Sequence, residues 1–113
     1  MNKTADKVCI PCHGEIPALK DNDLRLLKKD LSKKWNIVNK HHLEKEWTFD
    51  DFKTAVKFTN KIADLAEKQG HHPDIYLAWG KVKLKIWTHK IDGLSESDFI
   101  LAAKIDRLSL TKK

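Results

Sequence analysis

The sequence predicts an α+β domain in the order α-β-β-α-β-β-α, with a four-stranded antiparallel sheet and three helices packed on one face. Apolar residues recur at helical spacing in three segments and alternate with polar residues in two others, and two further short runs read as strands. Each strand pair is joined by a connection too short for a crossover, so each pair is antiparallel. One apolar face per helix and an alternating sheet imply two layers. A chain of 113 residues, 41% of them hydrophobic, fits one domain.

The N-terminal segment lacks the pattern of a regular element, because Pro11, Gly14 and Pro17 interrupt it. We therefore expect an arm over residues 1–20 and a single domain over residues 21–113.

The two cysteines, Cys9 and Cys12, both fall in this arm. A single pair is not the disulfide framework of a small secreted domain. Together with the adjacent His13 it offers fewer ligands than the four of a structural zinc site. The irregular segment also lacks the strand and helix that flank a thioredoxin-like redox pair. We expect no metal and no redox role for the arm.

The first helix is expected to begin after Asp21 or Asn22, because either residue is a suitable N-cap. Its apolar residues are Leu24, Leu27 and Leu31. Residues 35–38 and 43–49 read as strands, and residues 39–42 read as the turn between them. The two strands form the first predicted hairpin.

The longest helix is expected over residues 50–69, with Asp50 and Asp51 at its positive N-terminal end. Gly70 suits the residue after a helix, which often needs a positive φ, and Pro73 prevents any continuation. The predicted apolar stripe consists of Phe52, Val56, Thr59, Ala63 and Ala66, flanked by Ile62 and Leu65.

A second hairpin and a final helix complete the chain. Residues 75–79 and 81–87 read as strands joined near Gly80. Ser95 is the expected N-cap of the last helix, with Asp98 three residues later as its capping-box partner. The apolar residues of this helix are Phe99, Leu101, Ala102, Ile105 and Leu108.

The formal net charge of +6 raises the prior for an anionic partner. However, Lys81, Lys83 and Lys85 alternate with apolar residues, as on the solvated face of a strand. We therefore expect no nucleic-acid partner.

No apolar run approaches the ~20 residues of a membrane span, and the first residues lack the apolar stretch of a signal peptide. We expect no membrane partner and a cytoplasmic location.

Three histidines are candidates for chemistry. His71 and His72 precede the third predicted strand, and His89 follows the fourth. In an antiparallel hairpin, the start of one strand lies beside the end of the next. We therefore expect all three imidazoles at one edge of the sheet.

Imidazoles titrate near neutral pH, so one can donate a proton while another accepts one. A dehydration needs that combination, with an acid for the departing hydroxyl and a base for the compensating proton. A zinc site is the alternative that the residues leave open. Two further observations favour purely structural roles: Asp98 has its place in the capping box, and His41-His42 lies in a predicted turn without chemical company.

These residues resemble the signature of the pterin-4a-carbinolamine dehydratase family. The resemblance covers nearly the whole chain, including the Cys9-Cys12 arm. Its motifs are Glu67-Lys68-Gln69-Gly70-His71-His72-Pro73, Trp79, Thr88-His89, Gly93-Leu94-Ser95 and Asp98, with Trp35 and Phe49-Asp50-Asp51-Phe52 upstream.

The resemblance implies a lyase that converts 4a-hydroxytetrahydropterin to quinonoid dihydropterin, without metal or other cofactor. This reaction recycles the pterin of aromatic amino acid hydroxylases. By position, His71, His72 and His89 would be the catalytic imidazoles. Residues lining or supporting the substrate pocket would be Glu67, Pro73, Thr88, Asp98 and Trp35. Members of the family form dimers or tetramers, so a homodimer or homotetramer is expected.

Two alternatives to the enzyme stay open. One is a protein-binding module, since some members of the family are dimerisation cofactors of a transcription factor. The other is a pterin-binding protein without turnover. Three imidazoles at these spacings favour the enzyme over both. The sequence departs from the family at Gly70, where many members have Asp. We expect this difference to affect the activity or its pH optimum, because it removes none of the three histidines.

Overall fold

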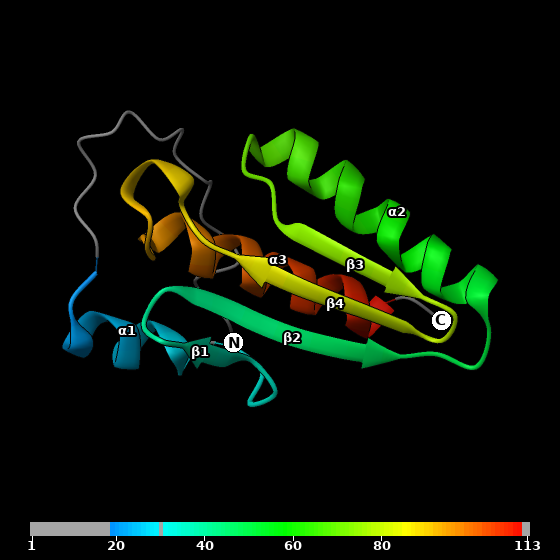
Figure 1. Ribbon diagram of the computed structural model, residues 1–113, viewed down its shortest axis with the longest axis horizontal. Coiled ribbons are helices and arrows are strands. Elements are labelled where there is room, and N and C mark those ends of the chain that lie inside the picture. Colours follow the sequence, from blue (N-terminus) through cyan, green and yellow to red (C-terminus); the bar gives the residue numbers. More distant parts are fainter. Residues whose placement is uncertain (1–18, 30, 112–113) are drawn as a thin grey trace.

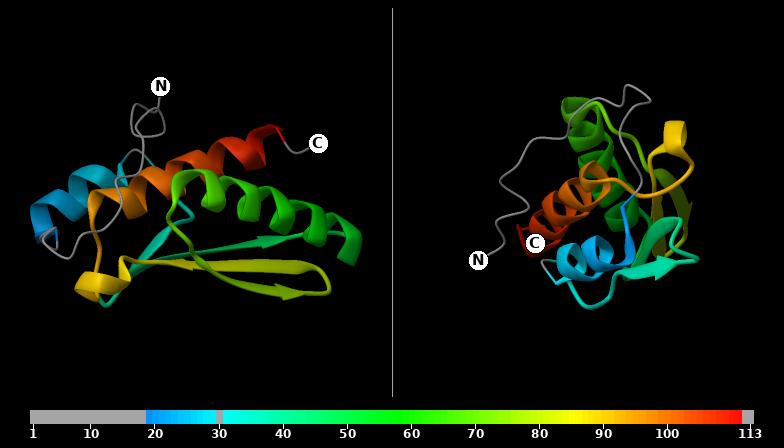
Figure 2. Two further views of the ribbon diagram at one scale, coloured as in Figure 1. Left: turned by 90° about the horizontal axis from the view of Figure 1, so that it is seen from above. Right: turned by 90° about the vertical axis from the view of Figure 1, so that its left-hand side faces the viewer.

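Three helices cover one face of a four-stranded antiparallel sheet, as predicted (Figure 1). The computed structural model describes residues 19–29 and 31–111, with the backbone alone for residues 109–111. The helices are α1 (Asp21–Lys28), α2 (Phe52–Gln69) and α3 (Glu96–Thr111), and a short 3₁₀ helix is η2 (His89–Ile91). The strands are β1 (Asn36–Val38), β2 (His42–Thr48), β3 (Asp74–Ala78) and β4 (Lys81–Ile86). Figure 2 shows the helical layer above the sheet.

The sheet order is β1-β2-β4-β3, so the second hairpin packs its last strand against the first hairpin. In this register Leu43 pairs with Ile86, and Asp74 pairs with Lys85. The beginnings of β2 and β3 therefore lie beside the end of β4, and η2 continues from that same end (Figure 1). This end of the sheet carries the site described below.

Helix α2 begins two residues later than predicted, because Asp51 caps it rather than belonging to it. The Asp51 carboxylate accepts a hydrogen bond of 2.7 Å from the Thr54 N–H. That backbone hydrogen bond is the main cause that lowers the pKa of Asp51. At the other end Gly70 adopts φ 65° and ψ 28°, the left-handed conformation predicted for it.

The predicted apolar stripe of α2 is wrong in part. Phe52 remains 47% exposed and Ala63 is exposed, although both belong to the predicted stripe. The face of α2 that packs against the core instead consists of residues spaced three and four positions apart. The buried residues of α2 are Ala55, Phe58, Ile62 and Ala66.

Helix α3 is buried on several sides, because it lies between α1, α2 and the sheet (Figure 2). Ile100 and Ala103 are buried in addition to the predicted Phe99, Leu101, Ala102 and Ile105, whereas the predicted Leu108 is partly buried. Ser95 precedes the helix, and its N–H donates to Asp98 Oδ2 at 2.8 Å, as the predicted capping box requires.

The chain before β1 also packs onto the core. Helix α1 ends at Lys28, and Leu31 lies beyond it, although the sequence pattern placed Leu31 in the helical stripe. Leu31 is nonetheless buried. The Leu19 N–H donates to the Leu94 carbonyl at 2.9 Å, so the last residues of the predicted arm are docked. Residues 1–18, with Cys9 and Cys12, lie outside the described residues.

A largely buried carboxylate joins the two layers. Asp106 of α3 accepts hydrogen bonds from the Trp35 indole N–H at 2.9 Å and from the Lys45 ammonium at 2.8 Å. It also accepts from the Ser32 N–H at 3.0 Å. Lys45 faces the helices and is only 6% exposed, so this ion pair is buried.

Among the described helices, none combines the length and the apolar character needed to cross a bilayer.

Candidate active site

His71, His72 and His89 line one hollow at the end of β4, as the hairpin geometry predicts. The hollow has a volume of about 170 Å³, below the ~300 Å³ at which drug-sized sites begin, and so suits a small ligand. We call it the histidine pocket. Its lining residues are Gly70, His71, His72, Trp87, Thr88, His89 and Lys90.

A buried carboxylate holds His71. The Nε2 atom of His71 lies 2.5 Å from Oδ1 of Asp98, which has no solvent exposure. The other oxygen, Oδ2, accepts from the Thr88 hydroxyl at 2.8 Å and from the Ser95 N–H. Two donors satisfy Oδ2, and Oδ1 is left to accept from the imidazole. We therefore assign a proton to His71 Nε2, and in a neutral ring Nδ1 is then the proton acceptor.

His72 is held from the last turn of α2. Its Nε2 atom lies 2.5 Å from Oε2 of Glu67. This pair is open to solvent, since the side chains of His72 and Glu67 are 57% and 77% exposed. Contacts between such exposed side chains are weak, so Glu67 orients His72 without preventing a change of its side-chain conformation when a ligand binds.

His89 stands on a small closed loop. Thr88 and Gly93 form an isolated antiparallel bridge, in which the Thr88 N–H donates to the Gly93 carbonyl at 2.8 Å. Asp92 completes the loop with φ 48° and ψ 47°, a left-handed conformation that Asp tolerates better than most residues. The His89 imidazole packs against Trp87, with ring centroids 4.5 Å apart.

The expectation that no other functional side chains lie near His41 and His42 is wrong. His41 Nε2 lies 2.7 Å from Asp92 Oδ1, and the rings of His41 and Trp87 are 5.3 Å apart. The strand register explains this placement, because pairing of Leu43 with Ile86 sets His42 beside Trp87. Pairing of the first and second hairpins is a long-range contact that the sequence pattern does not give.

Of the predicted substrate residues, Thr88 lines the histidine pocket, whereas Glu67 and Asp98 reach it through the imidazoles they hold. Pro73 is half-buried immediately before β3 and is not part of the lining. The structure does not bring Trp35 to the pocket. Trp35 is fully buried and bonds to Asp106, since its indole fills the core between the sheet and α3. Trp87 and Lys90 line the pocket but were not predicted.

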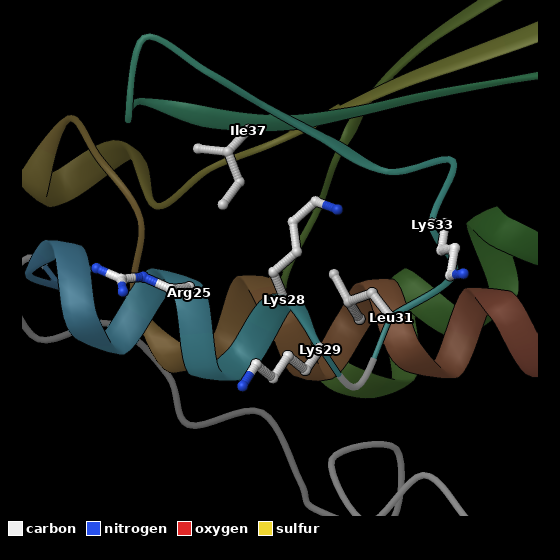
Figure 3. Close-up of a pocket in the computed structure, with 6 residues that line it drawn as sticks. All are labelled: Arg25, Lys28, Lys29, Leu31, Lys33 and Ile37. Carbon is white, nitrogen blue, oxygen red and sulfur yellow. The ribbon is translucent and has the colours of Figure 1, made fainter.

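A larger hollow of about 490 Å³ lies between α1 and β1 (Figure 3). Its polar lining consists of the cations Arg25, Lys28, Lys29 and Lys33. Among the described residues, its lining includes no imidazole or carboxylate, so these residues offer no acid–base pair. Within the described part of the chain, no group of three or more His, Cys, Asp or Glu side chains could hold a metal ion.

Comparisons with known proteins point to one family. The model of the family described as Pterin 4 alpha carbinolamine dehydratase matches residues 17–108. Several similar proteins bear the name "Putative pterin-4-alpha-carbinolamine dehydratase". The one from Alkaliphilus metalliredigens is 52% identical over 107 residues, which cover 95% of this chain and 96% of the relative. The one from Rubrobacter xylanophilus is 47% identical over 108 residues, which cover 96% and 100%.

A solved structure shares the fold. The crystal structure of a transcriptional coactivator/pterin dehydratase from Brucella melitensis superposes with a TM-score of 0.75 at 28% identity. The superposition covers 81% of this chain and 98% of that chain.

Proposed function

The chain belongs to the pterin 4 alpha carbinolamine dehydratase family, and from this premise we propose that it is a lyase acting on 4a-hydroxytetrahydropterin. The bond between C4a and its hydroxyl oxygen breaks, and the hydroxyl leaves as water after taking a proton from an acid. A ring N–H gives its proton to a base, and the electron pair of that bond forms the new double bond. The product is quinonoid dihydropterin, and the reaction recycles the pterin of aromatic amino acid hydroxylases.

The observation that carries this proposal is the presence of three imidazoles around one hollow. The reaction needs one proton donor and one proton acceptor at neutral pH, and histidine supplies both. His71 suits the base, because Asp98 keeps its proton on Nε2. His72 and His89 remain for the acid and for orienting the ring.

The proposal is tested by single-turnover kinetics with synthetic 4a-hydroxytetrahydropterin in a stopped-flow instrument. We expect His72→Ala and His89→Ala each to lower turnover about 10²-fold or more, the lower bound for a lost proton-transfer group. Circular dichroism should show both variants folded, because His72 and His89 are exposed. Folded variants that turn over at the wild-type rate would remove these residues from the mechanism.

A zinc-dependent reaction is the alternative that the three histidines raise. We expect treatment with EDTA, followed by removal of the chelator, to leave the dehydration rate unchanged. Loss of the rate, with recovery on adding Zn²⁺, would contradict the metal-free mechanism.

We also propose that the chain self-associates as a homodimer or homotetramer. Strand β3 is an edge of the sheet, and its neighbourhood carries exposed apolar side chains. Tyr76, Leu77 and Trp79 are 51%, 39% and 70% exposed. Light scattering should report a dimer or tetramer, and a monomer at micromolar concentration would refute this part of the proposal. The same surface supports the second candidate function, binding of another protein.

A further inference from the structure

The turn between β1 and β2 contacts the loop that carries His89. Asn39 and Lys40 have φ angles of 53° and 56°, which turns the chain sharply and presents His41 beside η2. His41 Nε2 lies 2.7 Å from Asp92 Oδ1. Asp92 is the residue that ends η2, so this contact joins two segments 51 residues apart in the sequence.

Trp87 fills the space between these segments. Its ring centroid lies 5.3 Å from that of His41 on one side and 4.5 Å from that of His89 on the other. The His42 ring completes the cluster at 6.1 Å from Trp87. A change in the position of His41 therefore acts on His89 by two routes, the Asp92 contact and the Trp87 ring.

The histidine pair contacts two flanking carboxylates. His41 Nε2 faces Asp92 Oδ1, so Nε2 donates there. The Nδ1 atoms of His41 and His42 lie 3.1 Å apart, so one of them donates to the other. His42 Nε2 is buried and lies 3.5 Å from Glu44 Oε1. The contacts of both His41 ring nitrogens therefore fix the plane of its ring.

We propose that His41 is a positioning residue of the histidine pocket. It holds the loop of His89 through Asp92 and supports the Trp87 ring, so that His89 is placed for proton transfer. Its kinetic consequence rests on the proposed dehydratase function, whereas its structural consequence does not. No substrate contact by His41 is required, because His41 is not part of the pocket lining.

The test uses His41→Ala, which removes the donor, and His41→Gln, whose amide can still donate to Asp92. Asp92→Ala and the double variant His41→Ala/Asp92→Ala complete a cycle. The matched control is Lys40→Gln in the same turn, since the Lys40 ammonium pairs with Asp21 of α1 and not with the loop. Two readouts are taken on the full chain: the NMR resonances of the His89 imidazole, and kcat and KM for the dehydration.

We expect His41→Ala to shift the His89 resonances and to lower kcat about fivefold, the upper range for loss of one partly exposed ion-pair contact, with KM changed less than twofold. His41→Gln should restore most of kcat, and the double variant should be no worse than either single one. Lys40→Gln should match the wild type in both readouts. Unchanged His89 resonances in His41→Ala, or additive effects in the double variant, would overturn the proposal. If the wild type shows no turnover, the dehydratase proposal fails, and the His89 resonances still decide the role of His41.

Discussion

Asp98 serves the helix and the histidine pocket with different oxygens. Its Oδ2 atom completes the capping box with the Ser95 N–H and accepts from the Thr88 hydroxyl. The Thr88 oxygen in turn lies 2.7 Å from the Ser95 hydroxyl, so this side of the carboxylate is fixed by a short chain of hydrogen bonds. Its Oδ1 atom is left for His71. The structural role and the role in the site therefore coexist in one residue.

This division predicts the effect of Asp98→Asn. The amide oxygen must take the Oδ2 position, because two donors face it there. The amide NH₂ then faces His71 Nε2 and forces the ring proton onto Nδ1. The base loses its acceptor nitrogen, so we expect turnover to fall about 10²-fold or more in the stopped-flow assay.

The control for Asp98→Asn is thermal unfolding, which should show a folded variant, since both cap contacts persist. A folded variant with wild-type turnover would show that the His71 tautomer does not matter. A second check is ¹⁵N NMR of His71, which should report the exchanged tautomer.

At the scale of residues, the sequence predicts that the three imidazoles lie together, but it does not predict which residues surround them. His71, His72 and His89 follow from the geometry of a single hairpin. Trp87 and His41 enter through contacts between hairpins, which depend on the sheet order. Trp35 matched a family position, but its contact with Asp106 could not be read from spacing.

Helix α2 carries Glu67 in its last turn and leads directly into His71 and His72. The positions of its ends therefore affect the geometry of the histidine pocket. Gly70 stops the helix one residue before His71. Asp51 starts it and is held by the Thr54 N–H. Because this hydrogen bond lowers the pKa of Asp51 below its ordinary value of 3.8, the carboxylate stabilises the folded state when it is ionised.

The stability that Asp51 contributes decreases at acid pH. The contribution of Asp51 is fully present above pH 3.8, the unfolded value, and is lost as the pH falls through the lower folded value. We expect Asp51→Ala to lower the midpoint of thermal unfolding by a few degrees at pH 7. The difference from the wild type should narrow as the pH is lowered from 4 toward 2.

Asp51→Asn is the matched control, because Asn also caps helices but does not ionise. It should stay close to the wild type at pH 7. An Asp51→Ala midpoint equal to that of the wild type at pH 7 would contradict the cap.

Among the described elements, the sequence predicts the three α-helices and the four strands, because turn residues and apolar periods mark them, but it does not predict the short helix η2. The buried face of α2 was missed because Phe52 fits the helical period as well as Ala55 does, and only tertiary packing decides between them.

The two layers of the molecule explain how a small chain holds a preorganised site. The sheet fixes one wall of the histidine pocket through β4, and the helical layer supplies Asp98 and Glu67. This arrangement follows from antiparallel hairpins and amphipathic helices, so the fold class could be predicted. The sheet order could not, since nothing in a local pattern states which hairpin edges meet.

Asp106 is where the layers are joined by charge rather than by apolar contact. The side chains of Lys45 and Asp106 are 6% and 14% exposed. Removing one partner of a buried ion pair leaves the other charge uncompensated, which costs more than the pair contributes. Asp106→Ala also deprives the Trp35 indole of its acceptor. We expect Asp106→Ala to lower the free energy of unfolding by about 3–5 kcal/mol, measured by urea denaturation. The exposed residue Asp64 of α2 provides the control, since Asp64→Ala should change stability by less than ~0.5 kcal/mol.

A second variant separates lost charge pairing from lost packing. In Lys45→Met/Asp106→Leu both charges are replaced by apolar side chains of similar volume, so we expect most of the stability to return. Turnover of the folded protein should stay unchanged in both variants, because neither Lys45 nor Asp106 lines the histidine pocket. A double variant as unstable as Asp106→Ala would mean that the hydrogen bonds to Ser32 and Trp35, and not the ion pair, hold the layers together.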